Sequence, residues 1–104
     1  MVMNLGLAIK NIRKQKGLKQ NQLAEVCKIT QAYLSQIENN AKDPNLSTLK
    51  TISSKLEIPL PVLFFLSMEN NDVPEHKQQA FGLIAPSIKS LVNEFFINTE
   101  LAHD

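Results

Sequence analysis

Two glutamines, Gln31 and Gln36, lie in a short segment whose spacing predicts a helix over Thr30–Asn39. The hydroxyl of the first residue can cap this helix, and asparagine tolerates the left-handed backbone that ends one. Leu34 and Ile37, three positions apart, mark the buried face. A glutamine amide can donate to and accept from the edge of an adenine at the same time. The pattern therefore predicts a helix that reads DNA bases through Gln31, Ala32 and Gln36.

A second short helix is expected just before it, over Gln20–Val26. Two short helices around a tight turn predict a helix-turn-helix, whose first helix crosses the phosphates while the second enters the major groove. Gln20 lies near a helix start, where free N–H groups favour anions, so we expect it at a phosphate. Tyr33 either contacts the DNA backbone or packs beside Leu34. Further candidates for backbone or secondary contacts are Lys19, Ser35, Asn39 and Lys42.

Helical spacing recurs along the whole chain, and no segment alternates with the period of two that is typical of a strand. A first helix begins near Leu5 and is stopped by Gly17. A fourth helix fits Asn45–Leu56, and a fifth, very apolar one begins at Pro59. The sequence thus predicts an all-α protein.

These helices divide the chain into a head and an extension. We expect a five-helix head at residues 3–68 and a polar linker at 69–74. An amphipathic helical extension is expected at 75–98. Pro86 lies in its middle, so the extension is either one bent helix or two helices that meet there.

Charge is distributed unevenly between the two parts of the chain. Residues 1–60 carry nine Lys/Arg against four Asp/Glu, a net +5, whereas residues 61–104 carry two against six, a net −4. A basic front half favours a polyanionic partner, because lysine and arginine displace counterions from phosphates. The charge pattern agrees with DNA as the partner.

The remaining composition excludes several other classes. A single cysteine, Cys27, excludes an internal disulfide and the multi-cysteine zinc patterns, and we interpret it as a small buried residue. No ligand pattern for a metal is present, and no cofactor is expected. The longest apolar run, Ile58–Leu66, is too short to cross a bilayer, and no signal peptide is recognisable. A cytoplasmic protein is expected.

Longer motifs strengthen the helix-turn-helix interpretation. Gly17–Ala24, Thr30–Asn39 and Pro44–Leu49 follow one another at a fixed spacing. Together with the flanking apolar positions, the run Leu5–Leu66 resembles the lambda-repressor-like, Cro/CI-type helix-turn-helix domain, also called the XRE family. The resemblance covers about sixty residues in order.

The resemblance implies a transcriptional regulator that binds double-stranded DNA. It further implies a dimeric repressor on a near-palindromic operator, and no enzymatic activity. By position, Gln31, Ala32 and Gln36 would face bases, Gln20 and Asn39 would hold phosphates, and Arg13 and Glu38 would form an internal ion pair. Three departures from the family pattern are Lys19 in place of a helix cap, and Lys28 and Asn40 in place of glycines. We therefore expect Lys28 to adopt a left-handed backbone.

The extension carries an apolar stripe with two open interpretations. It either folds back onto the head or forms a homodimer interface, because one small domain cannot easily cover so many large side chains. The residues assigned to dimerisation are Phe64, Phe65, Phe81, Ile84, Ile88, Leu91 and Phe95. The rival interpretation is a protein-interaction module, antitoxin-like or a co-regulator, whose C-terminal helix binds a partner protein. No Gly-rich phosphate loop, carboxylate pair or nucleophile elbow favours an enzyme.

Overall fold

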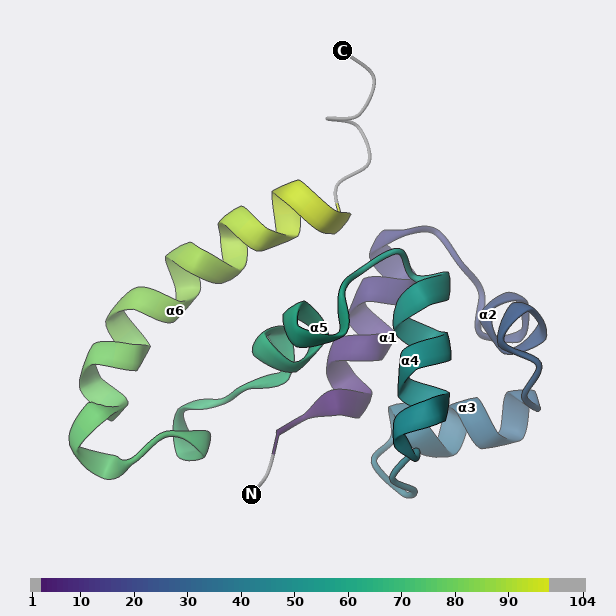
Figure 1. Cartoon of the computed structure of the whole chain (residues 1–104), viewed down its shortest axis with the longest axis horizontal. Coiled ribbons are helices and arrows are strands. Elements are labelled where there is room, and N and C mark those ends of the chain that lie inside the picture. Colours follow the sequence, from purple (N-terminus) through teal and green to yellow (C-terminus); the bar gives the residue numbers. More distant parts are fainter. Residues whose placement is uncertain (1–2, 98–104) are drawn as a thin grey trace, which may run out of the picture.

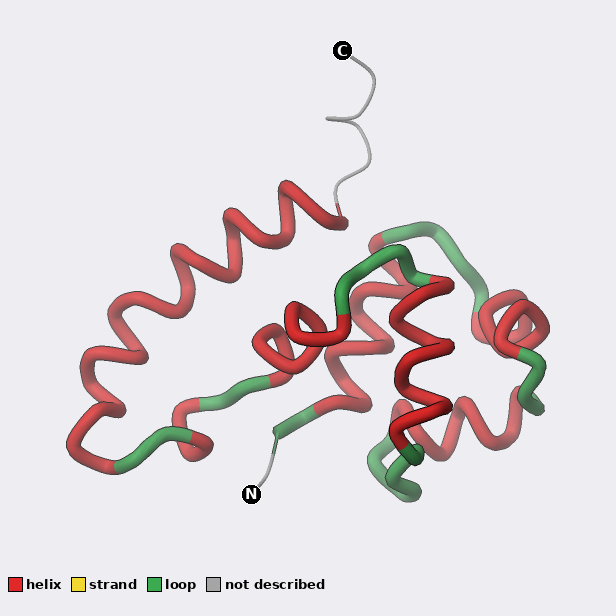
Figure 2. The backbone as a smooth tube through the Cα atoms, in the orientation of Figure 1, coloured by secondary structure: helices red, strands yellow, loops and turns green. Residues whose placement is uncertain are grey.

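The computed structural model describes residues 3–97 and places them in helices joined by short loops, with no strand among them (Figures 1 and 2). The predicted all-α class is confirmed. The α-helices are α1 (Leu5–Gln15), α2 (Gln20–Cys27), α3 (Gln31–Glu38), α4 (Leu46–Lys55), α5 (Leu60–Ser67) and α6 (Gln78–Val92). Two 3-10 turns, Asn70–Asp72 and Glu75–Lys77, precede α6, and a π-helical turn, Asn93–Ile97, follows it.

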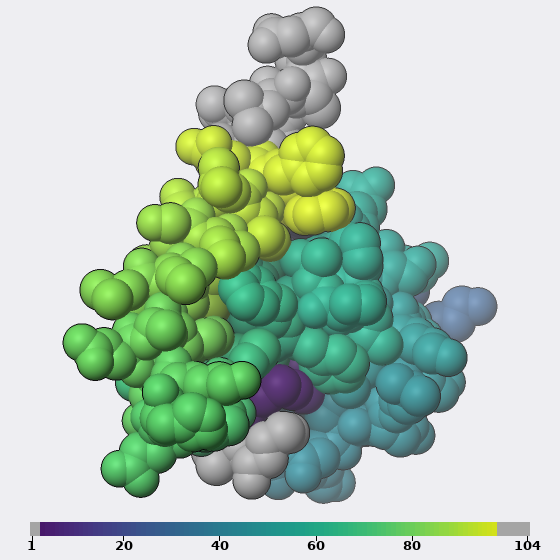
Figure 3. All heavy atoms as spheres, turned by 60° about the vertical axis from the view of Figure 1, so that its left-hand side comes forward, coloured from purple at the N-terminus to yellow at the C-terminus, as the bar shows by residue number. Residues whose placement is uncertain are grey.

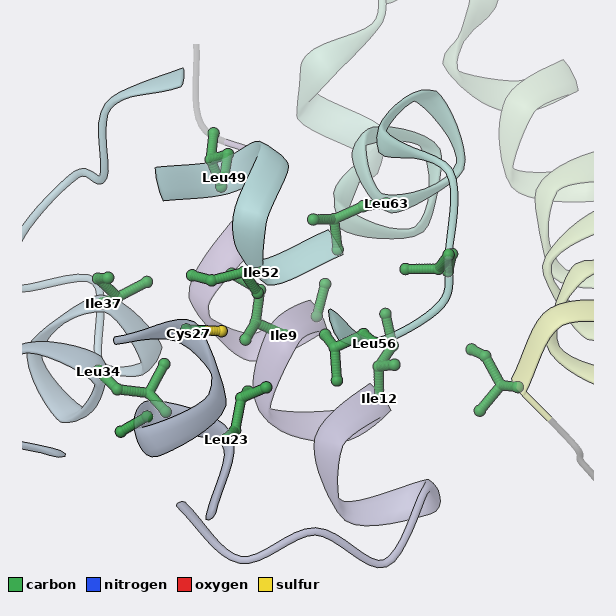
Figure 4. Close-up of a cluster of buried hydrophobic side chains, with 14 residues drawn as sticks. Ile9, Ile12, Leu23, Cys27, Leu34, Ile37, Leu49, Ile52, Leu56 and Leu63 are labelled. Atoms are coloured by element: carbon green, nitrogen blue, oxygen red, sulfur yellow. The ribbon is translucent and has the colours of Figure 1, made fainter. Parts of the chain in front are cut away.

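One hydrophobic core holds α1 to α5 together (Figure 4). Every one of these helices contributes a side chain that is removed from water almost completely, and burying each such side chain contributes about 1.5–3 kcal/mol. The most deeply buried are Ile9, Leu23, Leu34, Ile37, Ile52, Leu56 and Leu63. Because α3 is fixed from one side by Leu34 and Ile37, its opposite side is presented at the edge of the head (Figure 1).

Polar groups define where the short helices begin. The Thr30 hydroxyl accepts a hydrogen bond from the Tyr33 N–H at 3.0 Å and starts α3. Asn45 does the same for α4, accepting from the Thr48 N–H at 2.8 Å. At the start of α2 the cap is reversed: the Gln22 side chain accepts from the N–H of Lys19 at 2.8 Å. A glutamine thus compensates for the missing cap residue.

Each of the first four helices is followed by a residue with a left-handed backbone. Gly17 has φ +75°, and Lys28, Asn40 and Glu57 have φ between +58° and +59°. The expected left-handed conformation of Lys28 is found. For residues other than glycine this conformation costs about 1–2 kcal/mol, and asparagine tolerates it best. The left-handed residues that end α2 and α4, Lys28 and Glu57, therefore lower the stability of the fold.

The extension is helical from Glu75 and is not broken at Pro86. A 3-10 turn occupies 75–77, α6 then runs continuously from Gln78 to Val92, and Asn98 lies outside the described residues. A proline removes a hydrogen bond to the carbonyl four residues earlier, here Gly82. Both residues are exposed, so water can satisfy that carbonyl and the helix continues.

The extension lies against one side of the head (Figure 3). Within residues 75–97, only Ala85 and Ile97 are buried. Ile97 joins the core of the head, and Phe96 packs against it. The extension thus folds back at its end while most of its apolar surface remains in solvent.

Candidate nucleic-acid interface

The predicted base-reading residues share the solvent side of α3. Gln31, Ala32 and Gln36 are all exposed, whereas Leu34 and Ile37 on the other side are buried. The side chains are therefore free to enter a groove without disturbing the core. A helix of this size fits the major groove of B-DNA.

A buried ion pair joins the end of α3 to α1. Arg13 Nε donates to Glu38 Oε2 at 2.7 Å, and Nη2 donates to Oε1 at 3.1 Å. The two side chains are only 8% and 1% exposed, and Arg13 Nη1 also donates to the Leu18 carbonyl at 2.9 Å. Such a two-pronged contact fixes orientation as well as distance. It holds the reading helix in place against α1.

Gln20 extends this pair toward the exposed face. Its Nε2 donates to Glu38 Oε1 at 3.0 Å, and its Oε1 accepts from Gln31 Nε2 at 3.4 Å. The orientation of the amide follows from chemistry, because only the nitrogen can donate to a carboxylate. Four side chains thus form a continuous chain from the core to the groove-facing surface, and Gln31 keeps its Oε1 and one N–H free for a base.

The phosphate contact expected for Gln20 stays a prediction. Both polar atoms of its side chain bond to protein groups, and its Nε2 retains a second N–H. The resemblance indicates the Arg13–Glu38 pair, but nothing in the local pattern indicates that Gln20 links it to Gln31. The partners are 18 and 11 positions away along the chain.

The remaining candidates surround α3 with different exposure. Lys19, Asn39 and Lys42 are exposed, Ser35 is half-buried, and Tyr33 is half-buried and packs against the core. The loop that carries Lys42 is anchored to the helix, because its N–H and that of Ala41 donate to the Gln36 carbonyl at 3.2 and 2.8 Å. The lysine side chains are thus carried on well-defined backbone at both ends of the reading unit.

Asn40 is a structural residue that the sequence reasoning missed. Its Oδ1 accepts from the Gly6 N–H at 3.1 Å, and its Nδ2 donates to Asn4 Oδ1 at 2.7 Å. Asn4 also caps α1, and its N–H donates to the Ser67 carbonyl at 2.9 Å. One asparagine pair therefore joins the end of α3, the start of α1 and the end of α5. The only signal in the sequence was an asparagine where the family has glycine.

Close packing at this junction requires a glycine. A Cβ added to Gly6 would lie 2.4 Å from the Ile37 carbonyl oxygen and 2.6 Å from that of Glu38. Both obstacles belong to the backbone of the reading helix and cannot rotate away. The last turn of α3 is thus held against the first turn of α1 at backbone distance.

Cys27 belongs to the core rather than to a reactive site. The thiol is buried, and burial raises its pKa, with the positive charge of Lys55 acting in the opposite direction. A raised pKa keeps the thiol protonated and a poor nucleophile. Its role is packing.

The residues predicted for dimerisation divide into two groups. Phe64 packs against the core, and Phe65 and Phe81 are half-buried, so these three are not fully available to a partner. Phe65 and Phe81 line an apolar groove of about 460 Å³ between α5 and α6, together with Ile84 and Ile88. Leu91 is 68% exposed and Phe95, in the turn after α6, 79%, while Ile84 and Ile88 are 53% and 40% exposed; Leu83, which was not among the predicted residues, is 75% exposed.

Comparison with known proteins agrees with this geometry. A family model described as Helix-turn-helix matches residues 9–63, more than half of the chain. The immunity repressor protein of Bacillus phage phi105 is 39% identical over 61 residues, 59% of this chain and 42% of that protein. The regulator SutR of Escherichia coli is 33% identical over 73% of this chain and 43% of its own length. The regulator SinR of Bacillus subtilis is 35% identical over 57% and 54%. The chain thus spans about half the length of these relatives.

Proposed function

Because the chain belongs to the lambda-repressor-like (XRE) family of helix-turn-helix proteins, we propose that it regulates transcription by binding a specific double-stranded DNA site. The observation that carries this proposal is the chain of hydrogen bonds from Arg13 through Glu38 and Gln20 to Gln31. These bonds support a Gln31 side chain whose orientation is set before DNA binds.

Base reading is assigned to the exposed side of α3. Gln31 offers an acceptor and a donor to an adenine, and Gln36, one turn later, reads a neighbouring base pair. Ala32 is small enough to approach a thymine methyl group. Holding Gln31 before binding lowers the entropy lost on complex formation, which favours specificity. Lys19, Lys42 and Asn39 are assigned to phosphates, which position the protein without reading sequence.

We expect repression of promoters as a homodimer on a near-palindrome. The support comes from the extension, in which Leu83 and Leu91 on α6 and Phe95 in the turn after it are exposed, while Phe65 and Phe81 line a groove. A surface with both features can pair with itself around a two-fold axis. Two heads related in this way would place their α3 helices in successive major grooves, about 34 Å apart.

Oligomeric state is tested by sedimentation equilibrium on the full chain. The unmodified protein is expected at the mass of a dimer, and Leu83→Lys/Leu91→Lys at the mass of a monomer. The control is Leu46→Lys, which changes a leucine that is 56% exposed on α4, away from α6. A monomer for the unmodified chain, or a dimer for the α6 variant, contradicts the assignment.

DNA recognition is tested by selection from a randomised duplex pool, followed by sequencing. The expected product is one enriched motif with two-fold symmetry. The same selection with Gln31→Ala/Gln36→Ala is expected to enrich no motif while still retaining DNA at low salt, because the phosphate contacts remain. No enrichment with the unmodified chain would contradict the proposal.

The exposed face of α6 also favours a second candidate, an antitoxin-like or co-regulatory protein-interaction module whose C-terminal helix binds a partner protein. Under that alternative the selection fails although the chain is folded.

The segment Glu75–Ile97 is also long and apolar enough to cross a membrane. We assign the protein to the cytoplasm, because membrane insertion would withdraw Ile97 from the core and bury Lys89 in lipid.

A further inference from the structure

Lys89, in the last turn of α6, joins the extension to the head through its side chain. Its Nζ donates to the Met68 carbonyl at 2.6 Å. Among the described residues, this is the hydrogen bond that joins α6 directly to the head. The other side-chain bond from α6, from Gln78 to the Val73 carbonyl, reaches only the linker.

The position of the acceptor explains why a lysine suits it. Met68 is the residue that ends α5, where the last carbonyls of a helix have no partner within it. A cation near a helix C-terminus is stabilised by those carbonyls and by the helix dipole. The neighbouring Ser67 carbonyl is already occupied by the Asn4 N–H. Lys89 therefore completes the end of α5.

The contact matters because α6 is otherwise loosely attached. Ala85 and Ile97 are the buried residues of the extension, and a linker of short turns separates α6 from α5. Lys89 lies between these two apolar points and lines a polar recess of about 180 Å³ with Asn4, Ser67 and Glu69. A polar bond at this point fixes the direction of α6 relative to the head, which two apolar contacts alone define less sharply.

We propose that Lys89 is a positioning residue that sets which spacing between two DNA half-sites the protein prefers. The proposal rests on the proposed function, with α6 as the dimer contact. If two copies meet through α6, then the angle between α6 and its head determines the separation of the two α3 helices. A firm angle favours one spacing, and a loose angle accepts several.

The experiment measures affinity for duplexes that carry two copies of the selected half-site at different spacings, with one half-site alone as reference. Adding 5 base pairs moves the second half-site to the opposite face of the DNA. For the unmodified chain we expect this insertion to weaken binding about tenfold or more, and for Lys89→Met less than about threefold. Lys89→Met should bind the single half-site as the unmodified chain does and remain a dimer.

Two further variants keep the test decisive. Lys89→Arg, which can still donate to the Met68 carbonyl, should restore the spacing preference, whereas Lys89→Gln, shorter and uncharged, should behave like Lys89→Met. Lys50→Met makes the same change on the exposed side of α4 and should keep the preference. If Lys89→Met and Lys89→Gln both keep a strong preference for one spacing, the role proposed for Lys89 is wrong and the dimeric assignment stands. Absence of a preference in the unmodified chain overturns the dimeric assignment together with it.

Discussion

The Gln20 amide bonds to the Glu38 carboxylate at 3.0 Å, so a groove-facing residue of α2 is tied to an acid buried in the core. The same amide receives the N–H of Gln31 on its other side. Rotation of Gln20 breaks a charge-assisted bond to Glu38, and rotation of Gln31 breaks a neutral amide–amide bond to Gln20. The exposed side of α3 and the buried ion pair are thereby linked through one side chain.

Removing the Gln20 side chain should therefore affect specificity more than stability. In Gln20→Ala, Gln31 loses its support, and discrimination between adenine and other bases at its position should fall by about 1 kcal/mol, or about fivefold. Binding to single-base variants of the selected site measures this. The control is the adjacent exposed Asn21→Ala, which can alter only phosphate contacts. Equal loss of affinity for all sites in Gln20→Ala would instead indicate a phosphate role.

The buried ion pair should respond very differently to single and double substitution. Arg13→Met or Glu38→Leu leaves one charge buried without its partner, and each should lower the free energy of unfolding by about 3–5 kcal/mol. The double variant Arg13→Met/Glu38→Leu should be distinctly more stable than either, because no lone charge remains. Urea unfolding monitored by circular dichroism measures all three. Additive losses in the double variant would show that the two residues do not act as a pair.

Gly6 and Gly82 both lie inside helices, so the same substitution can be compared at a crowded and at an open position. Gly6→Ala places a Cβ against the backbone of α3 and should destabilise the chain by about 1–3 kcal/mol or more. For Gly82→Ala in α6 the nearest atom is 3.7 Å away, so the gain in helix propensity should raise stability by about 0.5–1 kcal/mol. The melting temperatures of both variants, each compared with that of the unmodified chain, measure these changes. The same sign for both changes would argue against the close contact at Gly6.

The left-handed residues offer a second pair with opposite expectations. Lys28→Gly relieves backbone strain and should raise the free energy of unfolding by about 0.5–1 kcal/mol. Asn40→Gly relieves less strain and loses the bonds to Gly6 and Asn4, so it should destabilise the head. Denaturant titration of the two variants measures the difference. Stabilisation by Asn40→Gly would mean that its side chain contributes nothing.

Much of the head could be predicted because its signals are local. The caps at Thr30 and Asn45, the stop at Gly17 and the spacing of Leu34 and Ile37 each depend on residues within a few positions of one another. The helices that they predict are found with shifts of a residue or two at the ends. The exposed side of α3 follows from the same periodicity.

The contacts that could not be predicted join residues far apart in the sequence. Asn40 bonds to residues 34 and 36 positions away, and Lys89 to one 21 positions away. No periodicity encodes such pairs, since they depend on how the helices pack. The sequence alone does not determine the course of the chain at Pro86, because continuation of a helix through proline depends on whether solvent reaches the freed carbonyl. The exposure of Gly82 decides that question here.

The most direct test of the account is a fluorescence-anisotropy titration of the selected duplex with the unmodified chain and with Gln31→Ala/Gln36→Ala, each at two salt concentrations. We predict that the double variant binds the selected duplex about thirtyfold more weakly, a loss of about 2 kcal/mol, yet retains a weak, salt-sensitive complex. If the unmodified chain and the double variant bound the selected duplex equally tightly, and neither preferred it to a scrambled duplex, the assignment of α3 as the helix that reads DNA would be contradicted.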